Sequence, residues 1–288
     1  MQISILIPTY NNLNYLKFTI DSIIKNSNFD HQLLVHINDG SDGSLDYIKN
    51  LDIQFTRSDK NIGLCNSINQ LSKHIINDYV MYSHDDMFFC KNWDLYIKKE
   101  ISKYKDELFY LTGTNVSVDK GLINYSCGNT PETFDETKFE KFCEYDNTPD
   151  LQGSHWAPHI IHRKIWNEVG GFSEEFNPGD GSDPDLCMKL WNKGIRIFKT
   201  ISRFKVYHFS SVTTRKRNIK LNNGTKTFLL KYGFNPRFFR KYYLKGNELR
   251  AFDGPLDEPK ISMKMLFDLI INRLKFFYSK ILWPINVL

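Results

Sequence analysis

Two adjacent carboxylates, Asp85 and Asp86, are the clearest indication of chemistry in this sequence. They end an apolar run, residues 79–82, whose length predicts a short buried strand. In an open α/β sheet, ligands bind beyond the carboxyl ends of the strands. Two neighbouring carboxylates repel each other unless a cation or a hydrogen-bond donor holds them. The pair therefore predicts a divalent metal or a hydroxyl-rich ligand; a solvated turn after a strand is the alternative.

The elements that must position this pair follow a repeated order of strand, polar turn and helix. Residues 3–7 predict a first strand that Pro8 ends, and a helix follows. Residues 33–37 predict a second strand, again followed by a polar turn and a helix. A third turn and helix, residues 61–75, lead to the strand that carries the acidic pair. This order is typical of βαβ units and predicts a parallel sheet.

Polar and glycine-containing blocks follow these predicted strands, and their order along the chain is informative. They are Pro8, Thr9, Tyr10 and Asn11; Asn38, Asp39, Gly40 and Ser41; Asn61, Gly63 and Asn69; and His84, Asp85 and Asp86. Together with the segments around Asp183 and His208, the blocks resemble those of glycosyltransferase family 2. The resemblance covers roughly residues 1–215, about three quarters of the chain. Several motifs in the same order arise by chance far less often than one.

This resemblance implies an α/β fold of the GT-A type, which is Rossmann-like. We expect a mixed, mostly parallel sheet flanked by helices, followed by a C-terminal helical extension. The catalytic domain would span residues 1–215, with a donor half at 1–100 and an acceptor half at 101–215. Residues 216–288 would form the basic helical extension.

The resemblance also assigns residues to a nucleotide-sugar donor. The first block, Pro8 to Asn11, and the residues Asn61, Gly63 and Asn69 would contact the donor. Asp39 would accept the imide N–H of a uracil base, although an Asx-turn is its ordinary structural role. Arg215 and Arg217 could fold over the diphosphate, because the guanidinium fork suits phosphate oxygens.

A metal site is implied at the acidic pair. Asp86 would be the direct ligand, and Asp85 would bind ribose hydroxyls or the waters of the metal. His208 would complete the site, with an ordinary core histidine as the alternative. A divalent cation supplies charge neutralisation to a departing diphosphate, and an imidazole ligand favours Mn²⁺ slightly over Mg²⁺.

The acceptor side needs a general base for the attacking hydroxyl, and Asp183 occupies the position at which the family carries it. Such a base must lie about 3 Å from the acceptor oxygen in the productive complex. Asp185 would support the acceptor side or serve as a first-turn acid of a helix. Gly153, His155 and Trp156 would lie near the sugar, although burial is the commoner fate of a tryptophan.

Composition agrees with a globular enzyme, since 41% of the 288 residues are hydrophobic. The five cysteines form an odd set without Cys-x-x-Cys spacing, which favours reduced thiols and a cytoplasmic location. No signal peptide or spanning segment is recognisable. The net charge of +5 is uneven, because residues 199–250 hold fourteen Lys or Arg and one acid, Glu248. This segment would attract phosphate; no nucleic-acid motif accompanies it.

The tail, residues 264–288, carries a polar stripe along a predicted helix with a wide apolar face. The stripe consists of Lys264, Asp268, Asn272, Lys275 and Ser279. Such a helix fits the inner surface of the cell membrane, and it equally fits docking on the catalytic domain or on a second subunit of a homo-oligomer.

We therefore expect a metal-dependent inverting glycosyltransferase that moves a sugar, from a UDP-sugar donor, to a glycan or lipid-linked acceptor. A sugar nucleotidyltransferase is one alternative, but it usually needs a glycine-rich, Arg-bearing loop after the first strand, which is missing here. A non-catalytic carbohydrate-binding relative is the other, suggested by Asn38, His84 and Ser182, which replace acids of the family pattern.

Overall fold

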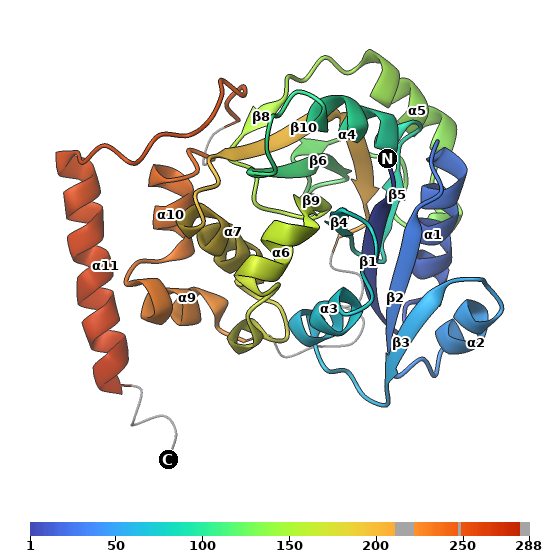
Figure 1. Ribbon diagram of the computed structural model, residues 1–288, viewed down its shortest axis with the longest axis horizontal. Helices are drawn as coiled ribbons and strands as arrows, with labels where there is room; N and C mark the ends of the chain where they lie inside the picture. Colours follow the sequence, from blue (N-terminus) through green and yellow to red (C-terminus); the bar gives the residue numbers. More distant parts are fainter. Residues whose placement is uncertain (211–221, 247–248, 283–288) are drawn as a thin grey trace.

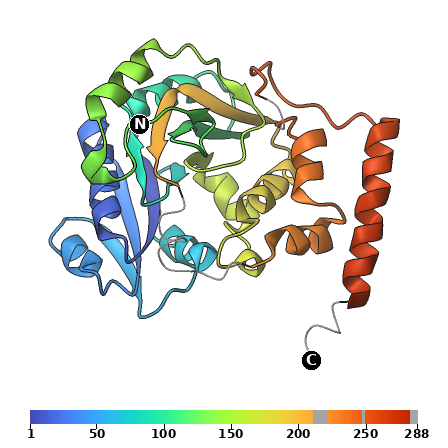
Figure 2. The same cartoon turned by 180° about the vertical axis from the view of Figure 1, so that it is seen from behind.

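The computed structural model describes residues 1–210, 222–246 and 249–282. One mixed sheet runs through both predicted halves of the catalytic domain. Helices α1 and α5 cover one face, and α3, α6 and α7 cover the other (Figure 1). The view from behind shows that α9, α10 and α11 form a separate layer outside α7 (Figure 2). The candidates Arg215 and Arg217 lie outside the described residues.

The elements have the following bounds. The strands are β1 (Ile3–Tyr10), β2 (Gln32–Asn38), β3 (Gln54–Ser58), β4 (Tyr79–Tyr82), β5 (Met87–Phe89), β6 (Phe109–Ser117), β7 (Ile123–Asn124), β8 (Leu151–Gln152), β9 (His159–His162) and β10 (Ile197–His208). The helices are α1 (Leu13–Asn26), α2 (Ser44–Lys49), α3 (Leu64–Ser72), α4 (Trp93–Ile101), α5 (Glu136–Tyr145), α6 (Arg163–Val169), α7 (Ser182–Asn192), α9 (Gly224–Tyr232), α10 (Pro236–Tyr242) and α11 (Met263–Leu282). Short 3₁₀ turns occupy Pro131–Thr133 and Glu174–Phe176.

The strand order across the sheet is β3-β2-β1-β4-β9-β6-β10-β5, with β7 beside β6 and β8 beside β10. The amino-terminal strands pair in parallel, and β9 joins them to β6 in antiparallel fashion. The predicted fold class, a mixed and mostly parallel sheet with a C-terminal helical extension, is confirmed. Because β1, β2 and β4 are parallel neighbours, their carboxyl ends meet at one edge.

The first strand does not end at Pro8, as the sequence had indicated. It continues to Tyr10, in register with β2 as far as Asn38. The ladder to β4 stops at Leu6, whose carbonyl accepts the N–H of Ser83. In a parallel strand, alternate residues bond to the same neighbour, so Pro8 faces the edge that β4 has already left. No ladder donor is needed there, and the proline is tolerated.

Strand β10 is held in place by buried ion pairs, and it carries His208 at its end. Lys199 Nζ lies 2.7 Å from Glu100 Oε1 and 2.6 Å from Asp150 Oδ2. Lys205 Nζ lies 3.1 Å from Asp146 Oδ2. Buried cations of this kind are retained only when they are paired, since an unpaired buried charge is strongly destabilising.

The C-terminal layer rests on the α/β part of the chain through α10, which contacts α7, and α11 packs on α9 and α10. Helix α11 stands at the edge of the molecule in both views (Figures 1 and 2). Within the described ranges, no helix combines the length and the apolar character that crossing a bilayer requires.

Candidate functional site

The carboxyl ends of β1 and β2 bring polar side chains together. Asn11 Nδ2 donates to Asp39 Oδ2 at 2.8 Å, and Asn11 Oδ1 accepts the N–H of Gly40 at 2.9 Å. Both Asn11 and Asp39 have positive φ, at 46° and 65°, a conformation that Asn and Asp tolerate better than other side chains do. These predicted donor residues are therefore brought together from two strands that are separated in sequence.

Asn38, which replaces an acid of the family pattern, is buried at the end of β2. Its Nδ2 donates to the carbonyl of Thr9 at 3.1 Å and to Ser67 Oγ at 3.0 Å. Its Oδ1 accepts the N–H of Ile62 at 2.9 Å. An amide can donate and accept at once, whereas a carboxylate cannot donate, so the asparagine suits this position better than the acid.

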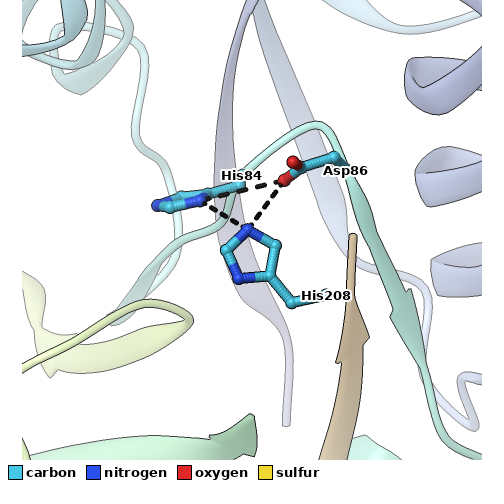
Figure 3. A group of neighbouring side chains, drawn as sticks. All are labelled: His84, Asp86 and His208. Atoms are coloured by element: carbon cyan, nitrogen blue, oxygen red, sulfur yellow. Dashed lines mark hydrogen bonds and ion pairs between the residues drawn. The ribbon is translucent and has the colours of Figure 1, made fainter. Parts of the chain in front are cut away.

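A His–Asp–His cluster lies where β4 and β10 end (Figure 3). His208 Nε2 lies 3.0 Å from Asp86 Oδ1, His84 Nδ1 lies 3.2 Å from His208 Nε2, and His84 Nδ1 lies 3.9 Å from Asp86 Oδ1. Ligands about 2.1 Å from an ion at right angles stand about 3 Å apart, which the two shorter distances match. The pair at 3.9 Å would subtend a wider angle, so the three atoms could still share one ion. The donor set fits a divalent metal.

The electrostatics of the cluster suit a cation. Burial, and then the neighbouring His208, lowers the pKa of His84 to about 4, which leaves the ring neutral at pH 7. Burial, and then the charge of Asp86, raises the pKa of Asp85 to about 7. Both carboxylates are buried, which argues against the alternative of a solvated turn. Thr9 Oγ1 donates to Asp85 Oδ2 at 2.6 Å, which ties this acid to the end of β1.

The predicted base, Asp183, lies in the first turn of α7 and lines a pocket of about 410 Å³. His155, Trp156, Asp180 and Arg240 line the same pocket. Asp183 Oδ1 is buried, and within the described part of the chain no group donates a hydrogen bond to it. Burial raises the pKa of Asp183 to about 7, close to the value at which a carboxylate works best as a general base near neutral pH.

Tyr82 is affected electrostatically by both groups of carboxylates. The pKa of this fully buried phenol is raised by burial first, and then by the charges of Asp183, Asp86 and Asp85, among others. Its ring centroid lies 5.3 Å from that of His84. Because one side chain is affected by both groups, the pocket at Asp183 and the His–Asp–His cluster belong to one region of the molecule.

Two of the predicted acceptor residues face the pocket, and their contacts hold them there. Trp156 is half-buried, and its Nε1 donates to the carbonyl of Gly113 at 3.1 Å. His155 Nδ1 lies 3.0 Å from the carbonyl of Gly153, and its Nε2 lies 3.4 Å from a guanidinium nitrogen of Arg240. Both rings thus present one edge to the protein and can present another to a sugar.

Asp185 and Gly153 are placed elsewhere, and the structure gives each another role. The buried Asp185 carboxylate accepts from Ser173 Oγ at 2.6 Å and Tyr232 OH at 2.7 Å, and Lys231 Nζ lies 2.8 Å away. Both of its oxygens are therefore bonded to other residues of the protein and are not free to bind a sugar acceptor. Gly153 has φ +77°, and a Cβ there would meet the carbonyl of Leu244 at 2.3 Å, so close packing accounts for the glycine.

The loop before α3 is supported by contacts of Asn61, Gly63 and Asn69. Asn61 Oδ1 accepts the N–H of Gly63 at 2.9 Å. A Cβ on Gly63 would meet Asn177 Oδ1 at 2.1 Å. Asn69 binds both backbone groups of Phe172, at 2.8 and 3.1 Å, which joins α3 to the chain before α7. The structure thus gives these residues positioning contacts.

Two residues of this region were missed from the sequence. His84 was noted only as a replaced acid, although a histidine beside two acids is itself a metal-ligand signal. Arg240 lies in a long basic segment, and its sequence position gives no sign that α10 packs beside α7.

Comparison with known proteins agrees with this description. The sequence profile described as Glycosyl transferase family 2 matches residues 4–165. A search among curated proteins gives no match. The solved structure of S. aureus TarS 1-349 aligns with a TM-score of 0.53 and 15% identity, over 73% of this chain and 61% of that chain. Its complex with UDP-GlcNAc aligns with the same score and identity, over 74% and 61%.

GalNAc-T7 with UDP, GalNAc and Mn²⁺ aligns with a TM-score of 0.53 and 14% identity, over 77% of this chain and 44% of that chain. The chain spans less than two thirds of the length of these neighbours, and identities this low establish a shared fold alone. The sheet order and the shared architecture define a GT-A glycosyltransferase fold. Since the family profile covers more than half of the sequence, the chain belongs to glycosyltransferase family 2.

Proposed function

We propose that the protein transfers a sugar from a UDP-sugar to the hydroxyl of a glycan or lipid-linked acceptor, with inversion at the anomeric carbon. The observation that supports this most directly is the arrangement around Tyr82. The carboxylate of Asp86, in the His–Asp–His cluster, and that of Asp183, in the pocket, both raise the pKa of this one phenol, which supports a single site made of the cluster and the pocket. Inverting displacement needs a base on the acceptor side and charge neutralisation on the leaving-group side.

The donor would lie at the carboxyl ends of β1, β2 and β4. Asp39 is the proposed partner of the uracil imide, and the segment from Pro8 to Asn11 would line the nucleoside. Residues 1–100 would thus form the donor half, and residues 101–215 the acceptor half. Asp85 would bind ribose hydroxyls or metal-bound water. The hydrogen bond between Asn11 and Asp39, which joins the ends of β1 and β2, supports this placement of the donor.

His84, Asp86 and His208 would hold a divalent cation, which supplies positive charge to the departing diphosphate. Two imidazoles and one carboxylate suit Mn²⁺ better than Mg²⁺, because Mg²⁺ prefers oxygen ligands. This set differs from the prediction by including His84, whose neutral ring offers a lone pair. The solved structure of GalNAc-T7, which shares the fold, is a complex with Mn²⁺.

In the proposed reaction, Asp183 takes the proton of the acceptor hydroxyl while the oxygen attacks the anomeric carbon. The bond from that carbon to the diphosphate oxygen breaks, and the electron pair leaves with UDP. Trp156 and His155 would orient the acceptor, because their rings border the same pocket. Asp180 is an unsuitable substitute as base, since its Oδ2 accepts the N–H of Gly224 at 2.8 Å and caps α9.

The test is UDP release from a panel of UDP-sugars, with Mn²⁺, with Mg²⁺ and with chelator. We expect slow release that requires the metal and that an acceptor accelerates. Donor binding without any release, across the panel and in the presence of Mn²⁺, would favour the non-catalytic alternative. Two of the replaced acids have structural explanations that leave the site intact. Asn38 donates to the carbonyl of Thr9, and Ser182 Oγ donates to the carbonyl of Gly179 at 2.7 Å.

A further inference from the structure

Helix α11 contacts the rest of the protein through the side that carries Asp268 and Asn272, together with the buried Met265. Asp268 Oδ2 accepts from Lys241 Nζ and from Tyr242 OH, both at 2.6 Å. Asn272 is buried, and its Oδ1 accepts the N–H of Asn235 at 2.9 Å. The predicted polar stripe therefore faces α10, although an amphipathic helix usually turns its apolar side inward.

The opposite side of α11 is apolar and exposed. Phe267 is 63% exposed and Leu274 is 65% exposed. The exposed apolar face comprises Met263, Leu266, Phe267, Ile270, Leu274, Phe277, Tyr278 and Ile281. At about 100° per residue, these positions fall within an arc of about 120°, so they form one continuous surface. A continuous apolar surface that is exposed to solvent marks an interaction site.

Cations border this face on both sides. By the same helical geometry, Arg273 and Lys280 lie along one border, and Lys264 and Lys275 lie along the other. Asp268 is the single acid of the helix, and Lys241 engages it. An apolar face between two rows of cations matches an anionic lipid surface, in which acyl chains lie beneath phosphates.

A groove of about 790 Å³ between α10 and α11 adds to this charge. Arg237, Arg240, Lys241, Lys264 and Lys275 line it, together with Asp268 as its one acid. Among the described residues, no ion pair with an acid is found for Arg237, Arg240, Lys264 or Lys275. Unneutralised cations in a concave site attract phosphate.

Arg240 lines both this groove and the pocket of Asp183. A phosphate held in the groove would therefore lie beside the proposed acceptor pocket. From these observations we infer that α11 docks the protein on an anionic lipid bilayer, with its apolar face among the acyl chains and lipid phosphates in the α10–α11 groove. This docking does not depend on the proposed transfer reaction.

A second copy of the chain is a poorer occupant on charge grounds. If the apolar faces of two α11 helices met, the cations along their borders would lie against each other, and like charges repel. These cations are Arg273 and Lys280 on one border and Lys264 and Lys275 on the other. An anionic bilayer neutralises both rows at once, at about 1 kcal/mol for each cation near the surface.

The experiment is co-sedimentation of the full chain with vesicles of equal parts phosphatidylglycerol and phosphatidylcholine, and with vesicles of phosphatidylcholine alone. We expect binding to the anionic vesicles that weakens as salt is added, because the electrostatic part is screened. Leu274→Gln and Phe277→Gln should each weaken binding about tenfold, since each removes a large apolar side chain from the interface. Lys264→Gln and Lys275→Gln should each weaken it about fivefold.

Ile76→Gln is the matched control, because Ile76 is 69% exposed and lies outside α11. It should bind vesicles as the unaltered chain does. Far-ultraviolet circular dichroism checks that each variant is folded, and metal-dependent UDP release is measured on the same samples without vesicles. If UDP release were lost while vesicle binding stayed intact, the result would count against the proposed function and would leave the docking inference standing.

Two results would overturn the docking inference. One is a full chain that ignores anionic vesicles at low salt. The other is a dimer, seen by sedimentation velocity without lipid, that Leu274→Gln dissociates, because the apolar face would then be covered by a second copy.

Discussion

Replacing the proposed base by its amide, Asp183→Asn, keeps the shape of the side chain and removes its ability to accept a proton. General-base catalysis contributes roughly 10²–10⁴-fold, so turnover should fall by that factor, which corresponds to about 2.7–5.4 kcal/mol of activation free energy. Donor binding should survive, because Asp183 lines the proposed acceptor pocket, whereas the proposed donor contacts lie at Asn11 and Asp39. Asp180→Asn, in the same pocket, is the matched control and should retain turnover.

The pH profile gives a second, independent readout. Burial raises the pKa of Asp183 to about 7, so the carboxylate is the minor form below that pH. Because the base must be ionised to act, kcat/KM should rise with pH and level off above pH 7, with about a tenth of the plateau at pH 6. The Asn variant should lack this dependence.

Stability should change in the opposite direction with pH. An acid whose pKa is raised by folding binds more protons in the folded than in the unfolded state between its two pKa values, so its contribution to stability is lost as pH rises toward 7. The Asn variant should therefore be at least as stable as the unaltered chain at pH 8, measured by thermal unfolding. Turnover of Asp183→Asn at the unaltered rate, with its pH limb retained, would refute the assignment.

Three further predictions concern the donor side. Asp86→Asn should remove Mn²⁺ binding measured by calorimetry and metal-dependent UDP release, while circular dichroism stays unchanged; release that persists in excess chelator would contradict this. His84→Asp exchanges an imidazole for an oxygen ligand, so the affinity for Mg²⁺ should rise relative to that for Mn²⁺; an unchanged preference would exclude His84 as a ligand. Asn38→Asp should lower the free energy of unfolding by about 1–3 kcal/mol in urea titration, because the buried carboxylate cannot donate to the Thr9 carbonyl. The exposed Asn50→Asp is its control, and equal stability of the two variants would rule out this explanation.

Local patterns in the sequence determined the order of the elements and the fold class. Alternating strands, polar turns and helices predicted the parallel arrangement of β1, β2 and β4, and the ordered motifs predicted a GT-A sheet. These features depend on contacts between residues near in sequence and on the spacing of apolar residues, and both can be recognised in a single sequence. The family profile confirms the resemblance.

Features that depend on neighbours distant in sequence could not be predicted in the same way. Pro8 is compatible with β1 because β4 ends at Leu6, which is decided by pairing across more than seventy residues. Asp185 lies only two residues from Asp183, yet Tyr232 and Lys231 from α9 engage its carboxylate. His84 joins a metal-type cluster because β10 returns His208 to the end of β4.

The tail shows the same division between sequence and tertiary structure. Its composition determined that α11 is an amphipathic helix with a polar stripe and an apolar face. Periodicity alone leaves open which side meets the protein, because either side can pack if its partner is complementary. Only the folded chain places Lys241, Tyr242 and the backbone N–H of Asn235 opposite Asp268 and Asn272. Those contacts turn the polar stripe inward and leave the apolar face to the outside.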